Sequence, residues 1–459
     1  MSAIDDLARR LGPVCESAVS PLEIASALEF DGFSDRAARD GYGADDVFAL
    51  ARELYDRVPR RPAAPPAADD GGVWRPGRFQ PALHAVLYAL PAVCFPAAIA
   101  LLRGPGVVTV LVAALLAGWG LSQGLAAIGY GRLGSGGPAQ AGRVLRAGLL
   151  FGLAAGGVVL TVVALAAGSW PPTAVFGAGE VTYMLAAAVL LVTRAERWLL
   201  LALAPAAVGS AVYLGLGQPP RLTHLAWAAL AATPMLACVL ALSRRGTRTY
   251  PAMGYAGPGV VPSSTELRSA LPAVALGVLA GGLLALPVAV GPDGTGGVNT
   301  GALVASVPLA LSMGAAEWSL LWYRRRGQGL LRASGDPQWF GARARLALLT
   351  AMGQYAAVMV VLVAAAIAVA DAAGQVTPGW PVFGAAGGYA LLGIAMFGVL
   401  LLQASRVRAV PLLACAAALA AEFALRGAGL TAQLAVPGVL AAVITCYALA
   451  RAGDTTLHT

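Results

Sequence analysis

Three polar side chains lie inside long apolar stretches of the sequence and could do chemistry there: Gln123, Glu180 and Glu317. A charged side chain at the centre of a bilayer costs about 2.5–3.5 kcal/mol on insertion scales, and charged residues in membrane helices therefore mark substrate or ion paths. Glu317 fits a carboxylate that faces a cavity and binds a proton, a cation or part of a substrate. The alternative is a side chain that reaches the membrane surface or pairs with a loop arginine.

The other two candidates leave a similar choice open. Glu180 either lines a cavity or serves as a carboxylate near the end of its helix. Gln123, next to Ser122, either binds a sugar hydroxyl or hydrogen-bonds to a neighbouring helix. A further glutamate, Glu422, precedes Arg426 by four residues and is predicted to form a structural pair on one helix face. We therefore assign only the first three residues to a substrate path.

Other kinds of chemistry are not indicated by the sequence. It contains no GxxxxGK[ST] phosphate loop and no HExxH motif. Its cysteines show no metal-ligand spacing and are predicted to be buried thiols; they are Cys15, Cys94, Cys238, Cys415 and Cys446. We therefore predict no catalytic residue, no metal site and no cofactor, and we rank a membrane enzyme last among the possible functions.

The elements that position the candidate residues must be membrane helices. The chain has 459 residues, of which 58% are hydrophobic and 12% are charged, whereas soluble domains carry about 25% charged residues. This composition excludes an ordinary soluble globule, a disordered chain and a nucleic-acid-binding domain. It predicts an all-α polytopic membrane protein.

Twelve apolar stretches are long enough to be transmembrane helices, because a hydrocarbon core of ~30 Å requires about 20 apolar residues per helix. The predicted spans are residues 81–102, 106–128, 145–167, 174–193, 196–216, 222–243, 269–291, 301–323, 344–370, 382–403, 408–425 and 432–450. They divide into two halves of six. The end of the second span, Trp119 to Arg132, is similar to the end of the eighth, Met313 to Arg325, and this weak repeat supports two parallel halves.

The first 80 residues form a separate region, which holds 14 of the 23 acidic residues. Helices are predicted near 20–30 and 45–58. Acidic residues crowd the second helix, so we expect this region to bind a cytoplasmic protein partner and not nucleic acid. The predicted organisation is a cytoplasmic helical region at 1–58, a Pro/Gly-rich linker at 59–80, a first six-helix half at 81–243, a cytoplasmic loop at 244–268, a second half at 269–451 and a cytoplasmic tail at 452–459.

Arginine placement predicts the orientation, since cytoplasmic loops retain positive charge. All 31 basic residues are arginines, and the twelve spans place 28 of them on the side of the two termini. The opposite side has Arg103, Arg221 and Arg426. Both termini are therefore expected in the cytoplasm of a bacterial cell, with the protein in the plasma membrane. The net charge of +8 then favours anionic lipids at the cytoplasmic face.

One segment centred on residues 119–148 resembles a known family. It reads Ile128-Gly-Tyr-Gly-Arg132 and then Ala141-Gly-Arg-Val-Leu-Arg-Ala-Gly148. This resembles the multidrug/oligosaccharidyl-lipid/polysaccharide exporter (flippase) superfamily, in which a helix containing a glutamine runs into such a loop. The resemblance implies a V-shaped twelve-helix carrier with a central cavity that Gln123 faces. The chain departs from the family in lacking a cavity cluster of Arg and Lys and an aspartate in the first helix.

The leading hypothesis is a carrier or flippase that exports an envelope polysaccharide or a lipid-linked glycan by alternating access. A different class of function is a non-transporting scaffold for cell-envelope synthesis or cell division, docked through residues 1–58. A major-facilitator carrier also has twelve helices, but it needs an acidic residue in the loop from Gly131 to Arg143, and none is present.

Overall fold

The structure is a computed structural model of the chain. It describes residues 3–59, 80–243, 262–289, 300–333 and 337–454, apart from residues 19, 32, 103, 137, 170, 373, 375–376, 378, 406 and 426–427. Most of the predicted linker 59–80, most of the loop 244–268 and the end of the tail 452–459 lie outside the described residues. The chain divides into two compact units, Met1–Gly77 and Arg78–Thr459, each described here by itself.

The N-terminal unit is a small helical domain with a hydrophobic core of its own. Its helices are α1 (Ala3–Arg10), α2 (Gly12–Ser17), α3 (Pro21–Phe30), α4 (Asp35–Tyr42) and α5 (Val47–Arg57). The core includes Cys15, Ile24, Leu28 and Leu50, each at most 1% exposed. The Asp46 carboxylate caps α5 by accepting the Ala49 N–H at 2.6 Å. Sequence periodicity indicated only α3 and α5, because the other helices are too short to show a pattern.

The second unit consists of long apolar helices. They are α6 (Gln80–Leu101), α7 (Val107–Gly136), α8 (Pro138–Ala166), α9 (Pro171–Val192), α10 (Glu196–Gly215), α11 (Thr223–Ser243), α12 (Ser264–Ala289), α13 (Thr300–Leu311), α14 (Met313–Ala333), α15 (Pro337–Ala372), α16 (Trp380–Ala404), α17 (Ala409–Ala424) and α18 (Leu430–Arg451), with a short 3₁₀ turn, η1, at Pro220–Leu222. Each predicted span overlaps at least one of these helices, and the eighth, 301–323, overlaps both α13 and α14. The prediction of an all-α polytopic membrane protein is confirmed.

Ten helical segments among the described residues are long and apolar enough to cross a membrane, and α17 is a shorter apolar helix. The eighth predicted span, 301–323, is interrupted at Ser312, between α13 and α14. Pro308 lies one turn earlier and has no N–H to donate to the helix. Ser312 is fully buried, and its hydroxyl hydrogen-bonds to that of Tyr355 on α15 at 2.8 Å. An uninterrupted helix was expected here, because hydropathy does not register such a break.

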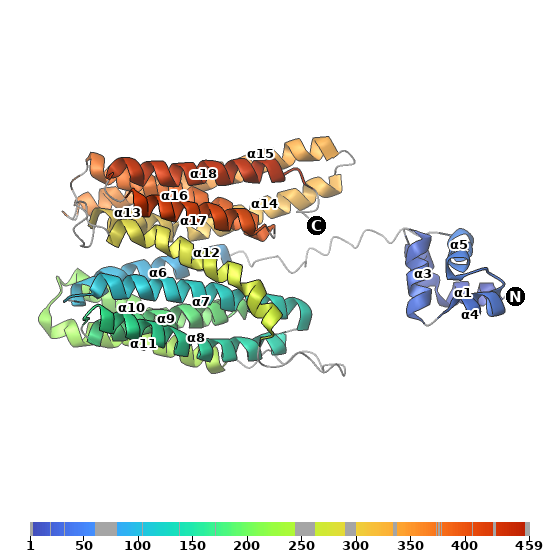
Figure 1. Cartoon of the computed structure of the whole chain (residues 1–459), viewed down its shortest axis with the longest axis horizontal. Helices are drawn as coiled ribbons and strands as arrows, with labels where there is room; N and C mark the ends of the chain where they lie inside the picture. Colours follow the sequence, from blue (N-terminus) through green and yellow to red (C-terminus); the bar gives the residue numbers. More distant parts are fainter. Residues whose placement is uncertain are drawn as a thin grey trace. The chain divides into compact units, whose positions relative to one another are not determined.

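Two hydrophobic cores divide the membrane unit at the middle of its sequence. Buried residues of α6–α11, such as Leu145 and Leu185, form one group, and buried residues of α12–α18, such as Met359 and Phe397, form the other. We call these two helix groups the first lobe and the second lobe. Figure 1 shows them as separate bundles, with α12 crossing obliquely between them. The predicted two halves are therefore two bundles in space.

The lobes meet along two seams. In one, α7 packs antiparallel against α12; in the other, α6 packs against α13 and α14. Because α6 and α12 are the first helices of the two halves, and α7 and α14 belong to the second helices, the two seams correspond to each other under the predicted repeat. Figure 1 shows α6, α7 and α12 in the region where the bundles approach.

Glycines allow the close contact in the α7–α12 seam. Gly120 and Gly124 are four residues apart on α7, and Gly277 and Gly281 are four residues apart on α12. A Cβ atom on Gly277 would lie 3.0 Å from the Trp119 carbonyl oxygen. Such small-xxx-small pairs let two membrane helices approach until their backbones touch. The seam is thus specified on both of its helices.

Candidate functional site

The three predicted path residues lie on three different helices. Gln123 is on α7, Glu180 is on α9 and Glu317 is on α14. The first two helices pack against each other in the first lobe, whereas α14 belongs to the second lobe. The structure thus distributes the candidates over both lobes.

Gln123 lies beside the seam between the lobes. Its side chain is exposed, and its Cγ atom lies 3.1 Å from the position that a Cβ on Gly277 of α12 would occupy. Its neighbour Ser122 is buried and donates its hydroxyl hydrogen to the Trp119 carbonyl at 2.9 Å. The amide of Gln123 can therefore reach a polar group that enters between α7 and α12.

Glu180 is a carboxylate held inside the first lobe. Its helix packs against α7, α8 and α11. Its Oε2 atom is buried and has no hydrogen-bond partner within the described part of the chain. A buried carboxylate without a partner is costly when it is ionised, so it binds a proton or another cation, or it is reached by a polar ligand. Glu180 can therefore hold a proton or a cation.

Glu317 is half-buried on α14, in the second lobe. Arg324, further along the same helix, donates to the Ala404 carbonyl of α16 at 2.9 Å. Glu317 therefore lies in the other lobe from Gln123 and Glu180.

Sequence reasoning gave Glu422 only a structural role. Its proposed partner Arg426 lies outside the described residues. Glu422 is 7% exposed on α17 and its Oε2 atom has no hydrogen-bond partner among the residues described. Among the described residues, Glu180 in the first lobe and Glu422 in the second thus each have a buried carboxylate oxygen without a hydrogen-bond partner. The signal available in the sequence was a lone glutamate in an apolar helix, the same signal that identified Glu180.

Sequence reasoning also missed an ion pair between the lobes. Arg132 at the end of α7 is 1% exposed and donates to Glu266 on α12. The sequence counted Arg132 only as a positive loop charge. Glu266 had one local signal, since Ser263 to Glu266 reads as a helix capping box. Nothing in the spacing of the sequence connects the two residues.

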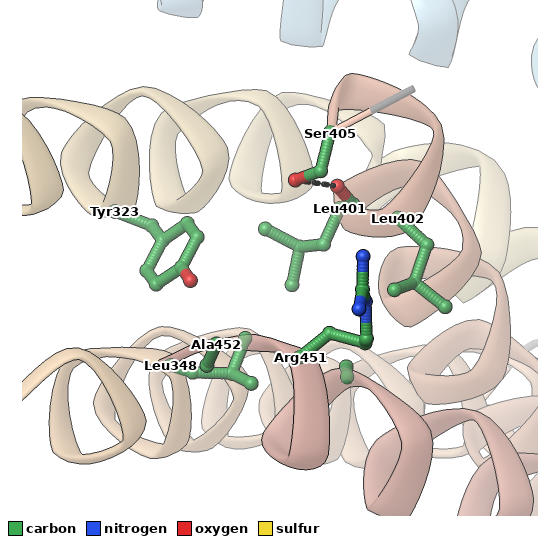
Figure 2. A pocket seen from close by; sticks show the side chains of 8 residues that line it. Tyr323, Leu348, Leu401, Leu402, Ser405, Arg451 and Ala452 are labelled. Carbon is green, nitrogen blue, oxygen red and sulfur yellow. Dashed lines mark hydrogen bonds between the residues drawn. The ribbon is translucent and has the colours of Figure 1, made fainter. Parts of the chain in front are cut away.

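A pocket opens at the end of the second lobe, between α14, α15, α16 and α18 (Figure 2). It has about 280 Å³ of empty space, part of it open to solvent, and Tyr323, Ser405 and Arg451 are its polar lining residues. The Ser405 hydroxyl donates to the Leu401 carbonyl at 3.1 Å, and Arg451 pairs with Asp454 at 3.2 Å. None of the three predicted path residues lines this pocket, so it is separate from the predicted path.

No metal centre is defined by the described residues, in which no group of three or more His, Cys, Asp and Glu side chains could hold an ion. The five cysteines are all free thiols. The polar groups described above can bind protons, cations and hydroxyl groups. They do not form a catalytic constellation.

No protein-family model and no curated protein matches this sequence. Solved structures do match it. A crystal structure of MATE in complex with MaD3S aligns with 82% of this chain and 96% of its own, at a TM-score of 0.50 and 15% identity. A crystal structure of MATE in complex with MaL6 aligns with 82% of this chain and 95% of its own, at a TM-score of 0.47 and 13% identity. A structure of an inward-facing multidrug resistance MATE family transporter of the MOP superfamily aligns with 83% of this chain and 96% of its own, at a TM-score of 0.42 and 14% identity.

The class of protein follows from the first of these likenesses: the chain is a multi-pass membrane protein with the fold of MATE transporters. This fold is the one that the resemblance of the segment around residues 119–148 implied.

Proposed function

We propose that this protein is a carrier that moves its substrate across the membrane by alternating access between the two lobes. The observation that supports the proposal most directly is the lobe arrangement. Two bundles with separate cores, in a transporter fold, meet at two seams that correspond under the internal repeat. Bundles of this kind can rock against each other while each keeps its own packing.

The substrate class we propose is an envelope polysaccharide or a lipid-linked glycan, exported across a bacterial plasma membrane. The exposed amide of Gln123 beside the seam is suited to sugar hydroxyl groups. The buried carboxylate of Glu180 is suited to a coupling proton or cation, and Glu317 to the polar part of the substrate near one end of the path. These three assignments make the path amphipathic, as a lipid-linked glycan requires.

The orientation we propose has both termini in the cytoplasm. The helix ends that carry Arg132, Arg194, Arg324 and Arg408 then form a single arginine-rich end of the membrane unit on the cytoplasmic side. Loops that retain positive charge support this orientation. Anionic lipid headgroups are the expected partners of this end.

A fluorescence assay tests transport directly. The full-length protein is reconstituted in liposomes with an NBD-labelled undecaprenyl-pyrophosphate sugar as the probe, and dithionite bleaches only the label in the outer leaflet. We expect wild-type protein to expose the inner-leaflet label. The double variant Glu180→Gln, Glu317→Gln should slow exposure at least about tenfold, which corresponds to the loss of about 1.4 kcal/mol from the limiting step.

The matched control is Asp371→Asn, because Asp371 is an exposed carboxylate at the end of α15 and lies outside the proposed path. A double variant that moves the probe at the wild-type rate would refute the assigned roles. Probe that stays protected in liposomes with wild-type protein would count against a glycan-lipid substrate.

The second candidate is a non-transporting scaffold for cell-envelope synthesis or cell division, with the N-terminal unit as its docking element. The observation that favours it is that the described residues of this unit form five helices with their own core. A cysteine introduced at position 123 separates the two functions. A water-filled path would be labelled by a membrane-impermeant maleimide from one side or the other. A scaffold would remain unlabelled from both sides.

A further inference from the structure

One ion pair links the lobes at the arginine-rich end of the membrane unit. Arg132, at the end of α7, donates from Nε to one carboxylate oxygen of Glu266 and from Nη2 to the other, the second bond being 2.8 Å long. The Arg132 side chain is 2% exposed and the Glu266 side chain 30%. Two parallel charge-assisted hydrogen bonds form the strongest arginine–carboxylate arrangement. The partners are 134 residues apart in the chain.

The Glu266 carboxylate is also held in place by hydrogen bonds within its own helix turn. The Ser263 N–H and hydroxyl donate to its Oε2 at 2.8 and 2.9 Å, and the Glu266 N–H donates back to the Ser263 hydroxyl oxygen at 3.3 Å. This is the reciprocal capping box of a helix N-terminus. Because the cap already fixes the side-chain rotamer of Glu266, little of its side-chain entropy remains to be lost when the ion pair forms.

The same turn of α12 is also tied to the second lobe. Arg408, the residue before α17, donates to the Ser269 carbonyl at 3.0 Å. The Ser269 hydroxyl donates to the Glu266 carbonyl at 2.8 Å. The first turns of α12 therefore receive one arginine from the first lobe and another from α17 of the second.

The end of α14, which the predicted repeat aligns with the end of α7, also carries arginines, since Arg324 and Arg325 follow Tyr323. Arg324 donates to the Ala404 carbonyl of α16, within its own lobe, at 2.9 Å.

We propose that the Arg132–Glu266 ion pair is a latch that keeps the arginine-rich end of the seam closed and must break before a path can open there. The latch rests on the proposed alternating access. Opening separates α7 from the start of α12, and the buried guanidinium of Arg132 must then become hydrated. Removing one partner of a buried ion pair leaves the other charge buried and uncompensated, which destabilises the closed state. Variants that remove one partner therefore shift the population towards the open state.

The test measures how fast a single cysteine at position 123, in a cysteine-free full-length protein, reacts with a membrane-impermeant maleimide added to the arginine-rich side of sealed vesicles. The variants are Arg132→Gln, Glu266→Gln and the double variant. We expect the cysteine in each single variant to be labelled about 10- to 100-fold faster than in the parent, which is the factor that a typical coupling free energy produces. The double variant should label no faster than the faster single variant, because both changes break the same pair.

The control is Arg143→Gln, since Arg143 is an exposed arginine on α8 near the same end, and its labelling rate should equal that of the parent. Glu266→Gln is the variant most certain to fold, because an amide oxygen still accepts the Ser263 N–H. The latch would be overturned if neither single variant changed the labelling rate. It would also be overturned if the rate increase in the double variant equalled the product of the two single-variant increases.

The outcomes separate the latch from the proposed function. If the parent protein is labelled from both sides and the variants do not change the rates, the latch is refuted and alternating access still stands. If the cysteine at position 123 is labelled from neither side in the parent or in any variant, both proposals are refuted, because no path opens at position 123.

Discussion

At the scale of single residues, the most informative side chains are carboxylates inside the lobes. Glu180 and Glu422 each have a buried oxygen without a hydrogen-bond partner in the part of the chain that is described. The sequence identified the first as functional because it stands alone in an apolar helix. It assigned the second to a local pair with Arg426, since spacing along one helix was the only geometry available. Burial within a lobe is a tertiary property that spacing does not encode.

Glu422→Gln should stabilise the protein. Burying an ionised carboxylate without a partner costs more than burying an amide, and the difference should be worth about 1–3 kcal/mol. Thermal unfolding in detergent measures the gain. Asp371→Asn is the control and should change little. A variant that unfolds at a lower temperature would show that Glu422 has a partner it needs.

Cys15 should react slowly with thiol reagents. Its side chain is 1% exposed in the core of the N-terminal unit, and burial raises the pKa of its thiol. Less thiolate is present at neutral pH, and thiolate is the reactive form. With the other cysteines replaced, Cys15 should label much more slowly than a cysteine at the exposed position of Ser26 in a Cys15→Ser protein. Equal rates would contradict the packing of this core.

At the scale of elements, the predicted spans were located correctly because an apolar helix leaves a continuous signal in the sequence. The break at Ser312 and the pairing of α7 with α12 were not predicted. Ser312 at the break forms a buried hydrogen bond to Tyr355, and the pairing rests on contacts between residues more than a hundred positions apart. The glycine pairs on α7 and α12 were visible in the sequence, but their spacing does not reveal which helix each one faces.

Gly277→Ala should weaken the α7–α12 seam. The added Cβ would lie 3.0 Å from the Trp119 carbonyl oxygen and 3.1 Å from the Gly120 Cα, so backbone must move, at a cost of about 1–3 kcal/mol. Thermal unfolding in detergent detects the change. The control is Gly157→Ala on α8, where a Cβ meets nothing within 4 Å and helix propensity should add up to about 1 kcal/mol of stability. Equal effects at both positions would contradict the seam.

At the scale of the whole molecule, the chain consists of two units, and the membrane unit consists of two lobes with separate cores. The sequence predicted two halves from a weak repeat and from the helix count. It did not predict how many helices form the N-terminal unit, because segments such as α1 and α4 are mostly polar and only eight residues long. Their hydrophobic contacts come from single residues such as Leu7 and Ala38.

A chain that begins at residue 78 should still insert and move the probe. The membrane unit has its own cores, and the division between units falls at Gly77. Its rate in the liposome assay should lie within about a factor of three of the full-length rate, a change under about 1 kcal/mol.

Leu50→Ala in the full-length protein should unfold only the N-terminal unit, at a cost of about 2–5 kcal/mol. Transport that stops when residues 1–77 are removed would show that the two units act together.

The separation of the two cores also bears on how the protein is made. The core of the first lobe contains residues only up to Ala241, so it can close while the ribosome is still translating the second lobe. The first helix of the second lobe to follow is α12, which carries the glycines and the capped Glu266 of the seam. The α7–α12 seam is therefore the first contact between the lobes that synthesis makes available.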